Sequence, residues 1–234
     1  MNEIKFLSPN LIIPHEEPSQ TKLNELTFKI KKDGFVNHPI LCTKLDEKII
    51  ILDGTHRFYA LKHLDIKFIP IQLVQYNKMR IKLSSWCWQF RIDENFLKLL
   101  SEFNGNILSQ TRNPRNYEVL IKSSESFILK FKNKVDFLRF LRSLNNIEYE
   151  RVLKDNLVEG IIFPTLNHNF FLFLARNGYK IPSGITRFKI QNRILFLRVP
   201  LSILSDEYEI VKFKEQIKER KFRVYEESVL VFEN

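Results

Sequence analysis

The sequence predicts a mixed α/β protein with two lobes, and three observations lead to this prediction. Short apolar runs alternate with amphipathic stretches along the chain, as expected where strands alternate with helices. An apolar fraction of 44% is enough for a full hydrophobic core. The length of 234 residues fits one large domain or two small ones.

The first lobe is predicted to contain, in order, a strand, a helix, a hairpin, a second helix and a strand. The residues expected in these elements are Lys5–Pro14 for the first strand and the loop after it, Thr21–Lys32 with Gly34 as C-cap, Ile40–Lys44 paired with Lys48–Leu52, the stretch from Thr55, and Phe68–Val74. This order describes a compact α/β unit that ends near Gln75.

The second lobe is predicted to be a further α/β unit, closely packed on the first. We place the division between residues 1–100 and 101–234, although the boundary is weakly marked and no linker is visible. Helices are expected over Ile92–Phe103, Val135–Leu144, Asn169–Asn177 with Gly178 as C-cap, and Glu207–Arg220. Strands are expected in a hairpin over Tyr117–Phe131, as mutually paired strands over Ile185–Pro200, and over Phe222–Phe232.

The formal charge of +10 admits nucleic acid, an acidic surface or phosphorylated substrates as partners. The excess Lys and Arg residues are spread along the chain without a dense basic tract. A generally basic surface is therefore favoured over a dedicated DNA groove.

The two cysteines, Cys42 and Cys87, lie in apolar or aromatic surroundings without the spacing of metal ligands. This pattern disfavours a zinc site or a disulfide scaffold. The first ten residues lack the apolar core of a signal peptide, and no later apolar run is long enough to span a bilayer. We therefore expect a cytoplasmic protein.

The most informative stretch is Ile49–Leu64, where an apolar run breaks at Asp53-Gly54 and an amphipathic pattern starts at once. This pattern predicts a buried strand that leads through a tight turn into a helix. The N-terminus of a helix presents unpaired N–H groups and a positive dipole end, which suit a phosphate. Gly54 can adopt positive φ, and Thr55 is predicted as the N-cap. Arg57 can bind phosphate oxygens as a fork, and His56 adds a donor.

Asp53 conflicts with this interpretation, because a carboxylate repels a phosphate. A divalent metal would resolve the conflict, since Mg²⁺ is commonly bound by one or two carboxylates together with substrate phosphates. The alternative is that Asp53 and Thr55 only cap the helix while His56 and Arg57 are solvated. Composition alone leaves the two interpretations balanced.

The segment Asp53–Arg57 resembles the signature of the ParB/sulfiredoxin-like fold, in which a strand–turn–helix binds nucleotide phosphates. Asn37–Leu41 and Ile69–Ile71 are similar to the strands that flank that corner in the family. Sulfiredoxins have a catalytic cysteine immediately before the His-Arg pair, where this chain has Thr55, so the resemblance does not imply reductase chemistry. Chromosome-partitioning members of the family have a Gly-Glu-Arg-Arg-type string and a following helix-turn-helix domain. Neither is found in this sequence.

A narrower resemblance is to the free L-serine kinases of this fold, the staphyloferrin B biosynthesis type. It depends on His15-Glu16 with its spacing to His38-Pro39-Ile40, on Ser85-Trp86, and on Ile181–Phe188 continuing into Arg193–Leu204. These matching segments cover the N-terminal part of the chain and a second block near its C-terminus.

This resemblance implies a role for each matched residue. The implied roles are Glu16 as catalytic base, Asp53 as a magnesium-linked or second catalytic carboxylate, Gly54, Thr55, His56, Arg57 and His38 as phosphate or nucleotide contacts, and Trp86, Thr186 and Arg187 as serine contacts. Three plainer alternatives stay open: Glu16 as an exposed loop carboxylate, His38 as a structural residue, and Trp86 as a core residue.

The expected function is phosphorylation of free L-serine to O-phospho-L-serine with ATP or ADP as donor and Mg²⁺ as cofactor. Residues 1–100 would bind the nucleotide and residues 101–234 would complete the substrate site. By analogy, the product would enter siderophore biosynthesis. The alternative function is a nucleotide-responsive, ParB-like DNA-binding or regulatory protein, and the charge of +10 favours it.

Overall fold

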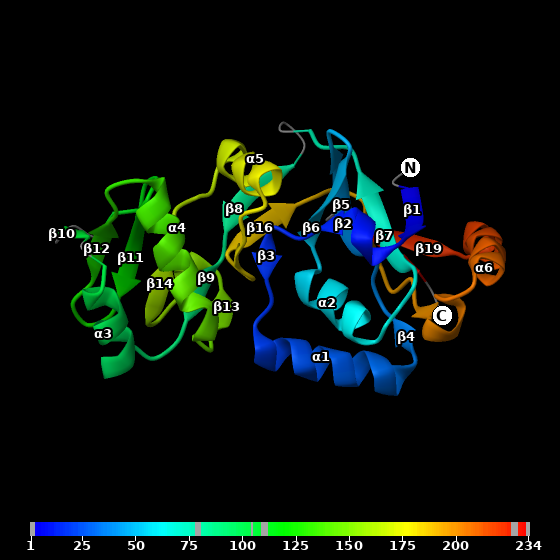
Figure 1. The fold of residues 1–234 in the computed structure, drawn as a ribbon, viewed down its shortest axis with the longest axis horizontal. Coiled ribbons are helices and arrows are strands. Elements are labelled where there is room, and N and C mark those ends of the chain that lie inside the picture. Colours follow the sequence, from blue (N-terminus) through cyan, green and yellow to red (C-terminus); the bar gives the residue numbers. More distant parts are fainter. Residues whose placement is uncertain (1–2, 78–80, 104, 109–111, 226–228, 233–234) are drawn as a thin grey trace. The chain divides into compact units, whose positions relative to one another are not determined.

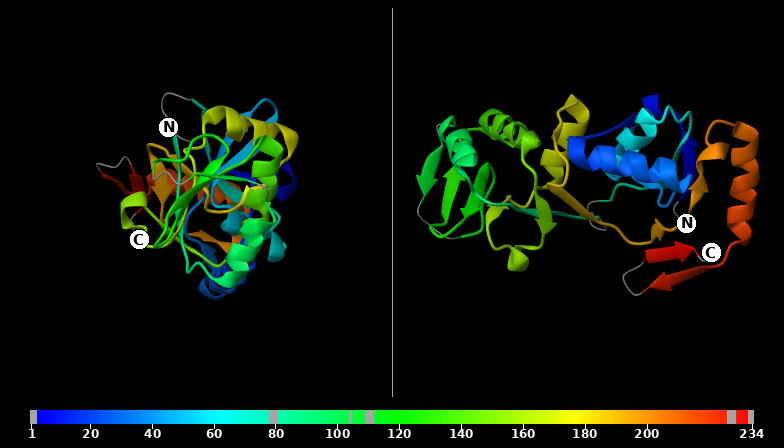
Figure 2. Two further views of the ribbon diagram at one scale, coloured as in Figure 1. Left: turned by 90° about the vertical axis from the view of Figure 1, so that its left-hand side faces the viewer. Right: turned by 90° about the horizontal axis from the view of Figure 1, so that it is seen from below.

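The computed structural model describes residues 3–77, 81–103, 105–108, 112–225 and 229–232, and the chain divides into two compact units. The first unit combines residues 1–82 with 188–234, and the second consists of residues 83–187 (Figures 1 and 2). This division differs from the predicted one at residue 100, because the C-terminal part of the chain returns to the first unit.

A five-stranded mixed sheet with strand order β1-β7-β5-β6-β2 forms the centre of the first unit. Its strands are β1 (Glu3–Leu7), β7 (Ile69–Val74), β5 (Ile40–Leu45), β6 (Lys48–Asp53) and β2 (Ile12–Ile13). The β1–β7 and β5–β6 pairs are antiparallel, whereas β5–β7 and β2–β6 are parallel. The predicted hairpin and flanking strand are thus confirmed.

In its described residues, this unit has three helices: α1 (Gln20–Asp33), α2 (Thr55–His63) and α6 (Glu207–Glu219). Gly34 ends α1 in the left-handed conformation with φ of 74°, as the sequence predicts. The core contains Ile40, Ile51 and Leu61, none of which is more than 2% exposed. Phe213 of α6 joins the same core and lies edge-on to Phe6, 6.3 Å between ring centroids. The C-terminal segment therefore completes the core of the N-terminal fold (Figure 1).

Short elements complete the first unit. They are the 3-10 turns Pro9–Leu11 and Leu201–Ile203, and the strands β3 (Glu16–Glu17), β4 (Phe35–Val36), β17 (Arg193–Leu195), β18 (Val199–Pro200), β19 (Phe222–Tyr225) and β20 (Val229–Phe232). β4 pairs with β18, and β17, β20 and β19 form a three-stranded sheet. The strands β8 (Lys82–Ser85) and β16 (Thr186–Lys189) contain the two points at which the chain passes from one unit to the other.

Of the two strand predictions near the C-terminus, the pairing within Ile185–Pro200 is wrong and the strand over Phe222–Phe232 is confirmed for its described residues. The segment Ile185–Pro200 does not form mutually paired strands, because β17 pairs in parallel with β20 instead of with β16. Phe222–Phe232 contains two antiparallel strands, β19 and β20, and its residues 226–228 lie outside the described residues. The strand residues of Ile185–Pro200 were recognised, but β17 finds its partner β20 more than 30 residues further along the chain.

The second unit is built on a six-stranded sheet with order β10-β12-β11-β14-β9-β13. These strands are β9 (Cys87–Gln89), β10 (Asn106–Leu108), β11 (Glu118–Lys122), β12 (Phe127–Lys130), β13 (Glu150–Val152) and β14 (Gly160–Ile162). All its strand pairs are antiparallel. Gly160 is required here, because a Cβ atom would lie 2.0 Å from the Trp88 carbonyl oxygen.

The helices α3 (Glu94–Ser101), α4 (Lys134–Ser143) and α5 (His168–Asn177) pack on this sheet with the short elements β15 (Ile181–Pro182), Leu144–Asn146 and Lys154–Asn156. The N-caps Asp93, Asn133 and Asn167 each accept a backbone N–H bond from the first turn. Trp88, Phe137 and Phe140 form the core and are at most 1% exposed. The mixed α/β class is confirmed, and no helix in the described part of the chain could cross a membrane.

Candidate active site

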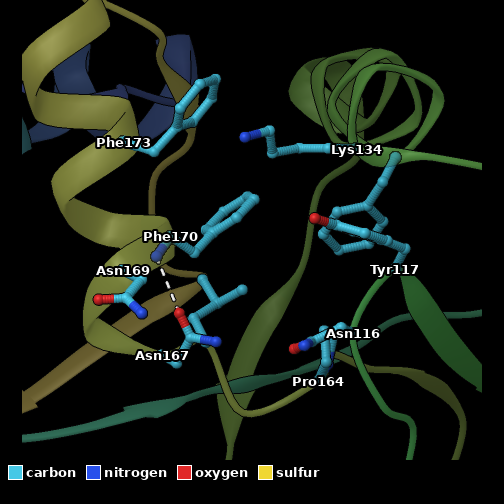
Figure 3. Close-up of a pocket in the computed structure, with 10 residues that line it drawn as sticks. Asn116, Tyr117, Lys134, Pro164, Asn167, Asn169, Phe170 and Phe173 are labelled. Atoms are coloured by element: carbon cyan, nitrogen blue, oxygen red, sulfur yellow. Dashed lines mark hydrogen bonds between the residues drawn. The ribbon is translucent and has the colours of Figure 1, made fainter.

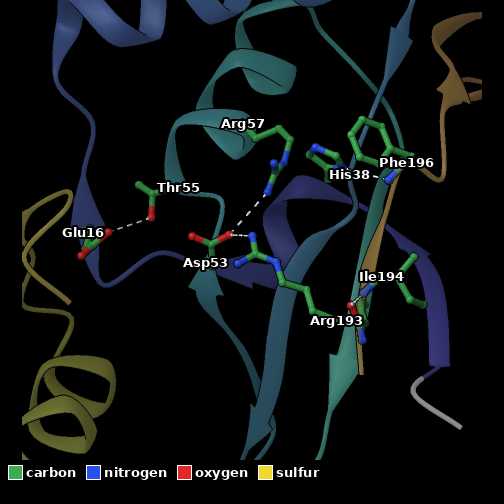
Figure 4. A network of polar contacts seen from close by, with 9 residues as sticks. Glu16, His38, Asp53, Thr55, Arg57, Arg193, Ile194 and Phe196 are labelled. Carbon is green, nitrogen blue, oxygen red and sulfur yellow. Dashed lines mark hydrogen bonds and ion pairs between the residues drawn. The ribbon is translucent and has the colours of Figure 1, made fainter. Parts of the chain in front are cut away.

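The predicted strand–turn–helix corner is present in the first unit, where β6 ends at Asp53 and α2 begins at Thr55 (Figure 4). Gly54 connects them with φ of 103°, a backbone conformation that residues other than glycine rarely adopt. A Cβ atom on Gly54 would lie 2.7 Å from Nη2 of Arg57. Glycine therefore allows the Arg57 guanidinium to fold back over the turn.

Thr55 has a different role from the one predicted. Gly54 is the N-cap of α2, so the expectation that Thr55 caps the helix is wrong. The Thr55 hydroxyl instead donates to Oε2 of Glu16, with 3.4 Å between the oxygens. The Thr55 side chain therefore does not cap the helix. The first backbone N–H groups of α2 stay available for an anion.

Glu16 is buried and is not the exposed loop carboxylate of the plainer alternative. It lies on β3 and is 7% exposed, and Thr55 is 4% exposed. Burial of a carboxylate costs free energy unless the group is hydrogen-bonded. A buried Glu16 is therefore better explained by a specific role than by a general need for a soluble surface. Figure 4 shows Glu16 and Asp53 on the two sides of the N-terminus of α2.

Two arginines converge on a single oxygen of Asp53. Arg57 Nη2 lies 3.7 Å from Oδ2, and Arg193 Nη2 donates to the same oxygen. Nε of Arg57 is buried and has no hydrogen-bond partner among the residues that the structure describes. Two guanidinium groups thus share one carboxylate, and the surplus positive charge suits an anionic ligand.

Arg193 is a site residue that sequence reasoning missed. It lies 140 positions from Asp53 and reaches it because β17 belongs to the first unit. Gln72 of β7 fixes that strand: its amide donates to the Asn192 carbonyl at 2.8 Å and accepts from Ile194 N–H at 2.9 Å. The block Arg193–Leu204 was noted in the sequence, but no local signal gives Arg193 this role.

His38 is held in place by a backbone contact. Its Nδ1 accepts a hydrogen bond from Phe196 N–H at 2.9 Å, and the two rings meet edge-on. Burial, followed by the nearby Arg57 and Arg193, lowers the pKa of His38 from 6.5 to about 4. The ring is therefore neutral near pH 7, and its Nδ1 has the structural role that the plainer alternative proposed.

His56 links the corner to the start of α1. Its Nε2 accepts a hydrogen bond from Ser19 N–H at 3.1 Å, which fixes the orientation of the ring. In the neutral ring this arrangement places the proton on Nδ1. If His56 donates a hydrogen bond to a ligand, as the sequence predicts, the donor is therefore Nδ1.

We expect the stability of the protein to fall as the pH decreases from 6.5 to about 4, partly through His38. Burial also lowers the pKa of His15 from 6.5 to about 4. Both histidines bind protons more readily in the unfolded chain, so their contribution is fully present above pH 6.5 and is lost as the pH falls to about 4. In thermal unfolding, His38→Asn should make this decrease shallower. The exposed His63→Gln is the control and should keep the wild-type slope; equal slopes for the two variants would contradict the assignment.

The polar groups of the corner fit Mg²⁺ only in company with a phosphate ligand. No group of three or more His, Cys, Asp or Glu side chains that could hold a metal occurs in the described ranges. Asp53, whose side chain is 36% exposed, offers a single carboxylate beside the helix N-terminus. This donor set matches the mode in which Mg²⁺ keeps several waters and shares its ligands with substrate phosphates.

The predicted serine contacts form a group within the second unit. The Arg187 guanidinium lies over the Trp86 ring, 4.3 Å from its centroid, and Arg151 lies 5.7 Å from the same centroid. Ser84 Oγ donates to the Arg187 carbonyl, and the backbone N–H of Trp86 donates to the Ile185 carbonyl. Thr186 is 8% exposed. No carboxylate among the described residues pairs with Arg187.

The two tryptophans have different environments. Trp88 is fully buried, stacks on Tyr149 with 3.6 Å between centroids, and donates from Nε1 to the Gly184 carbonyl. Trp86 is half-buried and is covered by arginines. Trp88 is therefore the core residue of the pair, and Trp86 has a ring face suited to a ligand pocket.

The structure gathers the predicted site residues into two groups, one in each unit. The first unit contains Glu16, His38, Asp53, Gly54, Thr55, His56 and Arg57, and the second contains Trp86, Thr186 and Arg187. Their roles in catalysis and binding stay predictions.

The comparisons with known proteins match the N-terminal segment to a domain family and the whole fold to solved structures. Residues 2–84 match the family model of the ParB N-terminal domain, which corresponds closely to the N-terminal segment of the first unit. The fold is that of SbnI with C-terminal truncation from Staphylococcus aureus, with a TM-score of 0.74, 21% identity, and coverage of 92% of this chain and 96% of that one. A free serine kinase in complex with AMP gives a TM-score of 0.70 at 17% identity, with coverage of 87% of this chain and 94% of that one.

Curated relatives agree with the narrower resemblance expected from the sequence. The chain is 24% identical to the ATP-dependent L-serine kinase SbnI of Staphylococcus aureus, over 98% of this chain and 97% of that protein. It is 34% identical to an ATP-dependent L-serine kinase of Staphylothermus marinus, over 36% of each. The ADP-dependent L-serine kinase SerK of Thermococcus kodakarensis is 27% identical over 38% of each. The predicted resemblance to the L-serine kinases of this fold is confirmed.

Proposed function

We propose that this protein is a free L-serine kinase that transfers a phosphoryl group from ATP or ADP to the serine hydroxyl and releases O-phospho-L-serine. Relatives named L-serine kinase, one of them matched along nearly its whole length, support the reaction class. The observation that carries the proposal is the burial of Glu16 beside Thr55 at the strand–turn–helix corner.

Phosphoryl transfer requires a positioned phosphate, charge neutralisation and a proton acceptor for the attacking hydroxyl. The proposed phosphate contacts are the N–H groups at the start of α2 and the guanidiniums of Arg57 and Arg193. The N–H groups at the start of α2 are already in place and need little reorganisation when charge develops on the phosphoryl oxygens. Arg193 joins the predicted set because it shares Asp53 with Arg57.

Glu16 is the proposed base. As the serine oxygen bonds to phosphorus, the bond from phosphorus to the leaving nucleotide oxygen breaks, and the hydroxyl proton passes to a Glu16 carboxylate oxygen. The Thr55 hydroxyl donates to Oε2 of Glu16 and so orients the carboxylate. A buried position keeps water from competing with serine as the phosphoryl acceptor.

Asp53 is the proposed holder of Mg²⁺, which would neutralise phosphate charge when bound. The two arginines occupy its Oδ2 in the structure, so we propose that nucleotide phosphates draw the arginines away from Asp53. Arg187 is proposed to bind the serine carboxylate with its bidentate guanidinium, and Thr186 and Trp86 are the other proposed serine contacts. A cytoplasmic location and use of the product in siderophore biosynthesis stay predictions.

The decisive experiment incubates purified protein with L-serine, Mg²⁺ and either ATP or ADP, and follows the products by phosphorus NMR. We expect the O-phosphoserine signal with at least one donor, and the comparison of the two donors identifies which one is used. L-threonine and L-homoserine in place of serine test the choice of acceptor.

A parallel arm measures binding to duplex DNA as a function of salt concentration. Tight and salt-sensitive DNA binding, together with no phosphoserine from either donor, would replace the kinase proposal with the DNA-binding alternative. Phosphoserine formation without such binding would support the kinase.

A further inference from the structure

A cavity of about 160 Å³ lies within the second unit, and its lining contains none of the predicted site residues. Its lining includes Tyr117, Lys134, Phe137, Asn167, Phe170 and Phe173. Figure 3 shows the Phe170 and Phe173 rings on one side, carried by α5, with Lys134 and Tyr117 opposite.

Four of the ten lining residues carry aromatic rings: Tyr117, Phe137, Phe170 and Phe173. Phe137 is fully buried and lies 5.9 Å from the Tyr117 centroid and 6.1 Å from that of Phe170. Phe170 and Phe173 are only half-buried, whereas Phe171 on the same helix is fully buried in the core. Two rings of α5 thus remain available to a ligand while the helix is anchored by a third.

Among the described residues that line the cavity, Lys134 is the cationic one. Its Nζ lies 3.4 Å from the Phe173 ring centroid, and no carboxylate in the described ranges forms an ion pair with it. Lys134 is the first residue of α4, where the helix dipole disfavours a cation. An amino group held over a ring at this place would be stabilised by an anion inside the cavity.

The backbone is strained at Tyr117, which also lines the cavity. Its φ is 59°, a left-handed backbone conformation that is unusual and energetically unfavourable for a bulky residue. This conformation directs the ring toward Phe137 while the Tyr117 carbonyl accepts from Phe131 N–H at 2.8 Å. Such strain is common where a side chain is held for a ligand.

We propose that this cavity binds a single-ring aromatic carboxylate, with the ring against the aromatic wall and the carboxylate at Lys134. The volume supports one ring, since an apolar cavity of about 150 Å³ in another protein binds benzene. The lining also contains the side-chain amides of Asn116, Asn167 and Asn169, which add polar groups for an acidic ligand. The proposal does not depend on kinase activity.

The test has to separate this cavity from the Trp86–Arg187 group. Ser85 Oγ donates to the Pro164 carbonyl at 2.6 Å and accepts from Leu166 N–H at 3.3 Å, and both of those residues line the cavity. Arg187 could also attract a carboxylate. The variant Arg187→Met is therefore included, and it should leave binding at the cavity unchanged.

The experiment titrates the protein into para-fluorobenzoate and follows the fluorine NMR line width. Wild type should broaden and shift the signal, and Lys134→Met should weaken binding about tenfold, the loss expected for one charge-assisted contact. Lys132→Met, an exposed lysine outside the lining, is the matched control and should bind like wild type. The uncharged para-fluorobenzyl alcohol should bind wild type about tenfold more weakly than the acid.

A second variant, Phe170→Leu, keeps an apolar side chain but removes a ring, and it should also weaken binding. Unfolding curves identify any variant that fails to fold, in which case the comparison of the acid with the alcohol on wild type decides. No broadening with wild type, equal binding by Lys134→Met and Lys132→Met, or loss of binding only in Arg187→Met would each overturn the proposal.

Discussion

Replacement of Glu16 by glutamine is expected to reduce phosphoserine formation by roughly 100- to 10,000-fold, the range typical for loss of a general base. The change removes the proton acceptor but keeps the size of the side chain. The amide oxygen of glutamine can still accept the Thr55 hydroxyl, which lies 3.4 Å from Oε2 of Glu16. The fold should therefore be preserved, and nucleotide affinity should change little.

The matched control is Glu17→Gln. Glu17 is the next residue on β3 and is half-buried, and neighbouring residues of a strand point to opposite faces. Phosphorus NMR gives turnover, thermal unfolding gives stability, and calorimetry gives nucleotide affinity for each variant. Turnover of Glu16→Gln close to that of wild type would remove Glu16 as the base, and loss of activity in both variants alike would point to a structural effect of β3.

The corner could be predicted from sequence because its determinants are local. Gly54, the apolar run before it and the helical pattern after it lie within a few residues, and Gly54 has the positive φ that was expected. The same holds for Gly34 and Gly178, which end their helices in the left-handed conformation. Short-range steric rules fix these features.

The charge partners of the corner could not be predicted, because they depend on long-range pairing. Arg193 meets Asp53 only because β17 returns to the first unit and is clamped there by Gln72. The local pattern of Ile185–Pro200 indicated strands but not their neighbours. For the same reason, a continuous division at residue 100 missed the C-terminal segment that packs into the first core.

The burial of Glu16 is another long-range result. Two consecutive glutamates are typical of an exposed loop, and only the family resemblance favoured a catalytic role. Thr55, 39 positions away, provides the hydrogen bond that makes a buried carboxylate tolerable.

The replacement Asp53→Asn is expected to have two separable effects: loss of turnover and a lower melting temperature without ligand. In wild type, one Asp53 oxygen is the counter-ion of both Arg57 and Arg193. Asparagine would leave two guanidiniums facing each other, one of them largely buried, at a cost of about 1–3 kcal/mol. The value is below that for fully buried pairs because the Asp53 side chain is 36% exposed and solvent screens part of the interaction.

ADP without Mg²⁺ should raise the melting temperature of Asp53→Asn more than that of wild type. The phosphates then supply the missing negative charge, and no carboxylate repels them. The matched control is Asp65→Asn, an exposed change just after α2 at φ of 51°, a conformation that asparagine tolerates. It should leave both turnover and the ADP-dependent shift unchanged.

The double variant Asp53→Asn with Arg193→Met tests the electrostatic cause directly. Removal of one guanidinium relieves the repulsion, so the melting temperature should return toward the wild-type value while turnover stays lost. A double variant that is less stable than Asp53→Asn alone would show that Arg193 stabilises the unit by packing and not through Asp53. Full turnover in Asp53→Asn would exclude Asp53 from phosphoryl transfer, because a neutral amide cannot replace the carboxylate in holding Mg²⁺ beside the phosphates.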